Sequence, residues 1–168
     1  AFKPVGELPQ YVNPASGYLF NTNHSPFLAT DVKYNLDIKK FDRTDGYETY
    51  HNNRSQRVTE LINGDKVDYT TFKRIKFDQQ LPQQLKYTYG IDSMLNLNAS
   101  DYPAVKEVIT AFQSWDRRSV AGSKGAAVFL ITYYYLAERL KGIPSRPISK
   151  AEAVETYQHV YDHMIKHF

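Results

Sequence analysis

The spacing of apolar residues divides the chain into an N-terminal part without helical periodicity and a longer part with it. Up to about residue 50, scattered apolar residues are closely interrupted by Pro and Gly, which favours loops and short strands. Within this part, the run Tyr18-Leu19-Phe20 lies between turn signals and predicts a short strand. We therefore predict a mostly α fold with a short N-terminal β/loop arm. The arm spans residues 1–50, and a helical domain spans residues 51–168.

Two short helices are predicted directly after this arm. Apolar residues at helical spacing indicate a first helix that Asn63-Gly64 ends, because these residue types favour the conformation that follows a helix. Asp68 or Thr70 is suited to cap the second helix, since both side chains accept hydrogen bonds from backbone N–H groups. We expect this second helix to bury Phe72 and Ile75.

Three longer helices are predicted in the remainder of the chain. Ser100 or Asp101 would cap the first of them. The segment 124–141 is apolar on nearly every side, which predicts a deeply buried helix. The residues Ser149-Lys150-Ala151-Glu152 have the pattern of a capping box and predict the start of a last helix over residues 150–168.

Composition and charge exclude several classes of function. The 168 residues hold 21 basic and 18 acidic side chains, and no basic run alternates with aromatic residues, so we expect no nucleic-acid partner. The chain has no cysteine, which excludes disulfides, thiolate zinc sites and cysteine nucleophiles. No apolar run is long enough to cross a bilayer, and no phosphate-binding glycine loop occurs, so we expect neither a membrane span nor a bound cofactor.

The segment Asn13–Pro26 is the strongest candidate for a functional site. Its predicted strand ends in a group of short polar residues, Asn21, Asn23 and His24, which Ser25-Pro26 follows. An Asn side chain offers an uncharged N–H donor at fixed geometry, which suits the binding of a substrate oxygen. The pattern alone favours an Asn-rich turn after a hairpin strand, because such turns are common.

Two further features favour ordinary structural roles when they are taken alone. His159, His163 and His167 recur every four residues and share one helix face, where two imidazoles and a third ligand would bind zinc. The solvated face of a surface helix is the favoured interpretation, and we expect no metal site. Arg57 lies at the start of a predicted helix, where its charge opposes the helix dipole. It is therefore either a surface residue or a residue held for another purpose.

Taken together, several segments resemble the penicillin amidases and the acyl-homoserine-lactone acylases, which are N-terminal-nucleophile hydrolases. Asn13–Pro26 resembles the family's "NP.sGy..n.Nn.P" segment, and Arg54–Leu61 resembles its arginine-bearing helix start. Asp78 resembles the aspartate of a "q.D" element, and Phe112–Asp116 resembles an "L..WD" turn. Gly125–Phe129 resembles the helix start with small residues that follows.

The resemblance implies a hydrolase that cleaves an amide by acyl transfer. In this family a precursor cuts itself, and the new N-terminal Ser of the β chain acts as nucleophile and, through its own amine, as base. A backbone N–H and an Asn side chain hold the oxyanion, and the Asn corresponds to Asn23. The family's arginine near the active site corresponds to Arg57. Ala1 is not a nucleophile, so the chain is expected to be an internal fragment of the β subunit, inactive alone.

The resemblance also implies partners and a location. The fragment would belong to an αββα sandwich, together with the α chain and the rest of the β chain, and would act on a small-molecule amide. A bacterial periplasmic or extracytoplasmic location is implied. A structural calcium ion is implied for the parent protein, with Asp31 or Asp37 as the candidate ligand in this chain.

A second hypothesis does not involve catalysis. The tyrosine-rich apolar helices predicted at residues 124–141 and 150–168 would form a groove for a protein partner. The chain would then be a stand-alone helical binding module.

Overall fold

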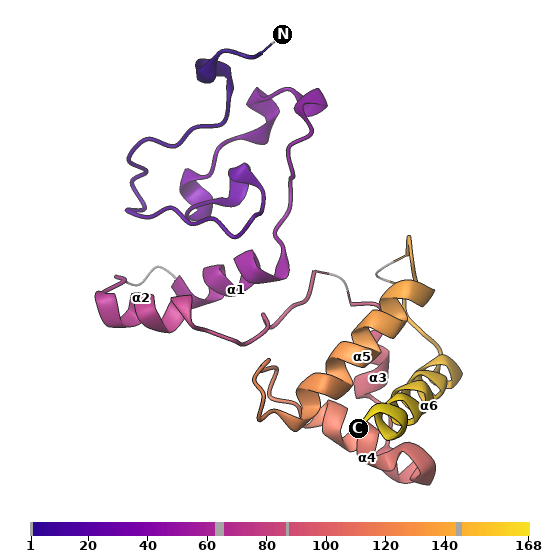
Figure 1. Ribbon diagram of the computed structural model, residues 1–168. Helices are drawn as coiled ribbons and strands as arrows, with labels where there is room; N and C mark the ends of the chain where they lie inside the picture. The colour runs from indigo at the N-terminus through magenta and orange to yellow at the C-terminus, as the bar shows by residue number, and fades with distance from the viewer. Residues whose placement is uncertain (1, 63–65, 87, 144–145) are drawn as a thin grey trace. The chain divides into compact units, whose positions relative to one another are not determined.

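The computed structural model shows a mostly helical chain and describes residues 2–62, 66–86, 88–143 and 146–168 (Figure 1). Two compact units divide the sequence. The first comprises Ala1–Asp78 and Pro82–Lys86, and the second comprises Gln79–Leu81 and Tyr87–Phe168. The predicted domain boundary at residues 50 and 51 separates loops from helices, whereas the first compact unit also includes the two helices that follow the loops.

Short 3₁₀ turns make up much of the first 50 residues. Four side chains, each at the residue before a turn, accept a hydrogen bond from the backbone N–H two residues later: Ser25, Asp31, Asp37 and Asp42. Asp and Ser favour such local bonds, which compete with longer regular structure. The 3₁₀ turns are η1 (Val5–Glu7), η2 (Pro26–Leu28), η3 (Val32–Tyr34), η4 (Ile38–Lys40) and η5 (Arg43–Asp45).

The strand predicted at residues 18–20 is wrong. The structure assigns no strand there, and the only β-bridge within the described ranges is the isolated antiparallel pair Gln80–Arg118. The carbonyl of Tyr18 accepts hydrogen bonds from the hydroxyls of Thr30 (2.8 Å) and Ser16 (3.2 Å), and the Phe20 N–H donates to the Ala29 carbonyl at 2.9 Å. Two side chains and one backbone contact thus bind this segment, without a partner strand. The arm is therefore built from loops.

Two helices complete the first unit, α1 (Asn53–Ile62) and α2 (Tyr69–Lys76). The predicted end of α1 at Asn63-Gly64 includes residues outside the described ones. Asp68 caps α2 by accepting a hydrogen bond from the Thr71 N–H at 2.7 Å. Of the two predicted caps, Asp68 and Thr70, the first is therefore confirmed. The predicted burial of Phe72 is wrong, because its side chain is 52% exposed and no described element of its unit covers it.

The second unit is a helical cluster around α4, α5 and α6, which lie together in Figure 1. Phe112 on α4 contacts Phe129 on α5 and Tyr157 on α6, with ring centroids 6.1 Å and 5.7 Å apart. The Tyr157 side chain is fully buried, and its hydroxyl donates to the Met94 carbonyl of α3 at 3.1 Å. The elements are α3 (Ile91–Leu95), η6 (Ala99–Asp101), η7 (Pro103–Val105), α4 (Lys106–Gln113), α5 (Lys124–Arg139) and α6 (Lys150–His167).

The predicted start of α4 at Ser100 or Asp101 is wrong. Two 3₁₀ turns precede the helix, which begins at Lys106 without a side-chain cap. Tyr102 has φ −133° and ψ 70°, outside the α region, because the ring of the following Pro103 disfavours the helical conformation. A continuous helix from Ser100 is therefore interrupted.

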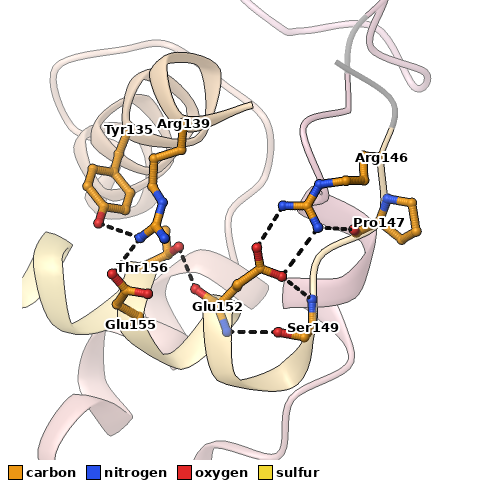
Figure 2. A network of polar contacts seen from close by, with 8 residues as sticks. All are labelled: Tyr135, Arg139, Arg146, Pro147, Ser149, Glu152, Glu155 and Thr156. Atoms are coloured by element: carbon orange, nitrogen blue, oxygen red, sulfur yellow. Dashed lines mark hydrogen bonds and ion pairs between the residues drawn. The ribbon is translucent and has the colours of Figure 1, made fainter. Parts of the chain in front are cut away.

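The deep burial predicted for α5 is found on only one side of the helix. Leu130 is 42% exposed and Tyr134 is 68% exposed, so one face of the helix lies outside the core of its unit. The capping box of α6 is confirmed: the Glu152 N–H donates to Ser149 Oγ at 3.2 Å, and the Ser149 N–H donates to Glu152 Oε2 at 2.8 Å (Figure 2).

No helix among the described residues is long and apolar enough to span a membrane.

Candidate functional site

The predicted donor, Asn23, lies in a tight turn with a left-handed backbone conformation. Its φ is +56°, and its N–H donates to the Oδ1 atom of Asn21 at 2.8 Å. This conformation costs roughly 1–2 kcal/mol for most residues, and Asn is among the types that adopt it most readily. The turn is therefore a constrained structure that needs support from its surroundings.

The orientation of the Asn23 amide is set by Arg54 on α1. The Nη2 atom of Arg54 donates to Asn23 Oδ1 at 3.2 Å. Because a guanidinium has no acceptor, the bonded atom must be the amide oxygen, and the two Nδ2 hydrogens lie on the other branch of the amide. Asn23 is exposed, and within the described parts of the chain its Nδ2 group donates no hydrogen bond. An N–H donor of fixed orientation is thus presented to solvent.

Asn52, at the start of α1, joins the turn to the helix. Its Nδ2 atom donates to the carbonyls of Thr22 (2.8 Å) and Asn23 (2.9 Å). Its Oδ1 atom accepts from the Ser55 N–H at 2.8 Å, and the Asn52 N–H donates to Ser55 Oγ at 2.9 Å. This reciprocal pair has the geometry of a capping box. The pattern Asn-x-x-Ser signals a helix start, but nothing in the sequence indicates its contact with Asn23.

His24 stabilises the same turn in one defined tautomer. Its Nδ1 atom accepts from the Thr22 backbone N–H at 3.2 Å, so this nitrogen must carry a lone pair. Its Nε2 atom therefore carries the proton and donates to the Leu28 carbonyl at 2.9 Å. The ring stacks against His51 with centroids 5.9 Å apart, and burial is the main cause that lowers the pKa of His51.

Arg57, the second predicted site residue, is bound to two carboxylates. Its Nε and Nη2 atoms donate to Asp78 at 2.8 Å and 3.1 Å, and its Nη1 atom donates to Glu60 at 3.0 Å. The hydrogen bonds with Asp78 raise the pKa of Arg57 above its usual value. No hydrogen bond joins Arg57 to Asn23 among the described residues, so the structure places Arg54, rather than Arg57, on the predicted donor.

Together, these contacts define what the site can do chemically. Helix α1 carries both arginines, and its first turn holds the Asn23 turn through Asn52 and Arg54. The exposed Asn23 amide is a neutral donor beside a guanidinium, an arrangement that stabilises negative charge on a ligand oxygen.

The implied calcium site does not fit the residues of this chain alone. Asp31 and Asp37 each use one carboxylate oxygen to accept a backbone N–H, from Lys33 at 2.9 Å and from Lys39 at 3.0 Å. Within the described ranges, no three acidic or histidine side chains come close enough to hold a metal ion. Because calcium takes six to eight oxygen ligands, further ligands would have to come from elsewhere.

The three histidines of α6 do not form a metal cluster in the described structure. The ring of His159 stacks on Tyr135 of α5 with centroids 4.0 Å apart. The centroids of His159 and His163 are 6.4 Å apart, and those of His163 and His167 are 4.5 Å apart. This geometry is that of a partly solvated helix face.

Comparison with known protein families matches residues 1–167 of the chain to the family described as penicillin amidase. No curated protein and no solved structure matches the chain.

Proposed function

This chain belongs to the penicillin amidase family, and on that premise we propose that it carries the side-chain oxyanion donor of an amide hydrolase. The observation that carries the proposal is the Asn23 amide. Its oxygen is bound by Arg54, its backbone is bound by Asn52, and its Nδ2 group is presented to solvent. A donor that is fixed before the reaction needs no reorganisation when negative charge develops, which makes it effective in catalysis.

In the proposed reaction, the nucleophile is an N-terminal Ser that these 168 residues do not supply. Its hydroxyl oxygen attacks the amide carbonyl carbon, while its proton passes through the α-amine to the leaving nitrogen. The carbonyl oxygen becomes an oxyanion in the tetrahedral intermediate, and Asn23 Nδ2–H donates to it. The C–N bond then breaks, and water hydrolyses the resulting ester to release the acid. One such donor contributes about 3 kcal/mol to the barrier reduction.

The two arginines have distinct roles in this proposal. Arg54 fixes the rotamer of Asn23 and adds positive charge beside the developing oxyanion. Arg57 supports the geometry from a distance, because its two hydrogen bonds to Asp78, which lies outside α1, hold the helix in position. Both side chains act through α1, the helix whose first turn binds the Asn23 turn.

The proposed partners are the remaining parts of an acylase precursor, its α chain and the rest of its β chain. Large apolar side chains are exposed in both compact units, which supports packing against further protein. These side chains include Val12, Leu19 and Phe77 in the first unit and Tyr134 and Ile165 in the second. Within an αββα sandwich in the bacterial periplasm, such surfaces would be covered.

The experiment is to express the complete reading frame that contains this chain and to assay it on chromogenic anilides with aromatic and fatty acyl groups. We expect turnover, together with an acyl adduct on an N-terminal Ser detected by mass spectrometry. The 168-residue chain, purified alone, should release no product. Turnover by the isolated chain, or no hydrolysis by the processed complete protein on any anilide, would contradict the proposal.

One observation favours a second candidate function. The exposed face of α5, with Leu130 and Tyr134, would suit a helical binding module without catalysis. A complete protein that never processes itself and hydrolyses no amide, but binds another protein through this face, would favour the module over the hydrolase.

A further inference from the structure

The Thr22 hydroxyl donates to Asn52 Oδ1 at 3.4 Å, and every other hydrogen bond that joins the Asn23 turn to α1 among the described residues is donated by Asn52 or Arg54. These two side chains act on different parts of Asn23. Arg54 contacts the end of the Asn23 side chain, whereas the Nδ2 atom of Asn52 contacts the carbonyls of Thr22 and Asn23, on both sides of the Asn23 Cα atom.

The bonds within the turn cannot replace the contacts made by Asn52. Asn21 and His24 bond to backbone groups of the turn and of the residues that follow it, so they determine its internal shape. They do not determine where the turn lies relative to α1. Two hydrogen bonds to consecutive carbonyls determine both the position and the direction of that piece of backbone.

We propose that Asn52 is a positioning residue for the oxyanion donor Asn23, an inference that rests on the proposed function. Asn52 holds the backbone from which the Asn23 amide extends, while its Oδ1 atom is held by the Ser55 N–H of α1. Through Asn52, the first turn of α1 thereby determines where the Asn23 amide lies. A displacement of about 1 Å at such a group is enough to cost roughly 100-fold in rate.

The test uses the substitution Asn52→Ser in the complete, processed enzyme. Serine still caps α1, because its hydroxyl can accept the Ser55 N–H, but it is too short to reach the two carbonyls and lacks the N–H₂ group. We expect kcat per processed molecule to fall roughly 10- to 100-fold with KM nearly unchanged, since the loss is specific to the transition state. Asn52→Asp also keeps the cap and replaces Asn52→Ser if that variant does not fold.

A double-mutant cycle separates positioning from a general structural role. In the background of Asn23→Gly, which removes the donor and tolerates the positive φ, Asn52→Ser should lower kcat by less than about threefold further. A merely structural residue would lower kcat by the same factor in both backgrounds, and that result would overturn the inference. Asn53→Ala is the matched control, since its side chain accepts from the Lys86 N–H at 2.7 Å instead, and kcat should stay unchanged.

The outcomes also separate this inference from the proposed function. A loss of activity in Asn23→Gly but not in Asn52→Ser overturns the positioning role and leaves the oxyanion donor in place. Unchanged activity in both variants overturns both.

Discussion

At the residue scale, two arginines one turn apart on α1 have different partners. Arg54 is exposed and contacts the side chain of Asn23, whereas Arg57 is 17% exposed and forms a two-point contact with Asp78. A two-point contact requires the planar fork of a guanidinium, which lysine cannot reproduce. In the proposed hydrolase, Arg54 would therefore supply positive charge on the substrate side, whereas Arg57 stabilises the first unit.

Substituting Arg57 by Lys should lower the free energy of unfolding of the first unit by about 1–2 kcal/mol. The loss arises because Asp78, 18% exposed, keeps its charge but loses one of the two charge-assisted hydrogen bonds that Arg57 donates to it. Native-state hydrogen exchange at α1 amides in the complete protein measures the change. Arg54→Lys is the matched control and should change stability by less than about 0.5 kcal/mol. Equal effects of the two substitutions would contradict the assignment.

The site residues differ in how well the sequence could identify them. Asn23 and Arg57 belong to short segments that resemble a family, so both positions could be named in advance. Asn52 and Arg54 act on Asn23 only because the chain folds back over about 30 residues. That contact depends on tertiary structure, and no local pattern encodes it.

At the scale of elements, the local signals were the most reliable. The capping box of α6 and the Asp68 cap of α2 were predicted correctly, because each depends on residues within one turn. The strand at residues 18–20 and the burial of Phe72 were predicted wrongly, because each depends on what a distant segment supplies. Pro103 is also a local signal: its ring disfavours the helical conformation at Tyr102, so α4 begins only at Lys106.

The packing of α5 predicts that Gly125→Ala destabilises the second unit by about 1–3 kcal/mol. Alanine normally stabilises a helix relative to glycine, but a Cβ atom here would lie 2.5 Å from Trp115 Cβ. Trp115 has little room to move. Its ring stacks on that of Phe129 with centroids 4.1 Å apart, and its Nε1 atom donates to the Arg118 carbonyl at 3.0 Å.

The measurement for this variant is hydrogen exchange at α5 amides in the complete protein. Gly122→Ala is the control, because no atom lies within 4 Å of the added Cβ, and it should be neutral or slightly stabilising. If the α5 amides were equally protected in Gly125→Ala and Gly122→Ala, Trp115 would be able to move aside without destabilising the unit, and the prediction would be contradicted.

The start of α6 predicts a pH dependence of local stability (Figure 2). Hydrogen bonds from Arg146, and then from the Ser149 N–H, lower the pKa of Glu152 from 4.5 to about 2. Because the folded pKa lies below the unfolded one, the stabilisation is fully present above about pH 4.5 and is lost as the pH falls through about 2. Protection of the first-turn amides of α6, corrected for intrinsic exchange, should decrease within this window.

Glu152→Gln should remove this pH dependence, since glutamine does not ionise. Glu107→Gln is the control, because Glu107 lies in the first turn of α4 and makes no hydrogen bond among the described residues. If α6 of Glu152→Gln lost protection over the same window as the unsubstituted protein, the carboxylate of Glu152 would not be the responsible group.

At the scale of the whole molecule, the chain is a mostly helical member of the penicillin amidase family that folds into two compact units. The helical content could be predicted from periodicity, because apolar residues at helical spacing recur through most of the chain after residue 50. The grouping of α1 and α2 with the loop arm could not, because Asn52, Arg54 and Arg57 make that connection through side chains far apart in sequence.

This organisation has a consequence for the site. The first unit holds the proposed donor, Asn23, in contact with Asn52 and Arg54, but it supplies no nucleophile of the proposed kind. The proposed activity therefore belongs to the complete protein, and the contribution of this chain is measured there.

The most direct measurement is kcat for anilide hydrolysis by the processed complete enzyme carrying Asn23→Gly. Glycine tolerates the φ of +56° at this position, so the substitution removes the amide without straining the turn. We predict a fall of about 100- to 1,000-fold in kcat per processed molecule, the size expected for one oxyanion donor. Asn13→Gly, at another Asn with positive φ, should leave kcat unchanged. A kcat of Asn23→Gly within about threefold of the unsubstituted enzyme would contradict the assignment of Asn23 as the oxyanion donor.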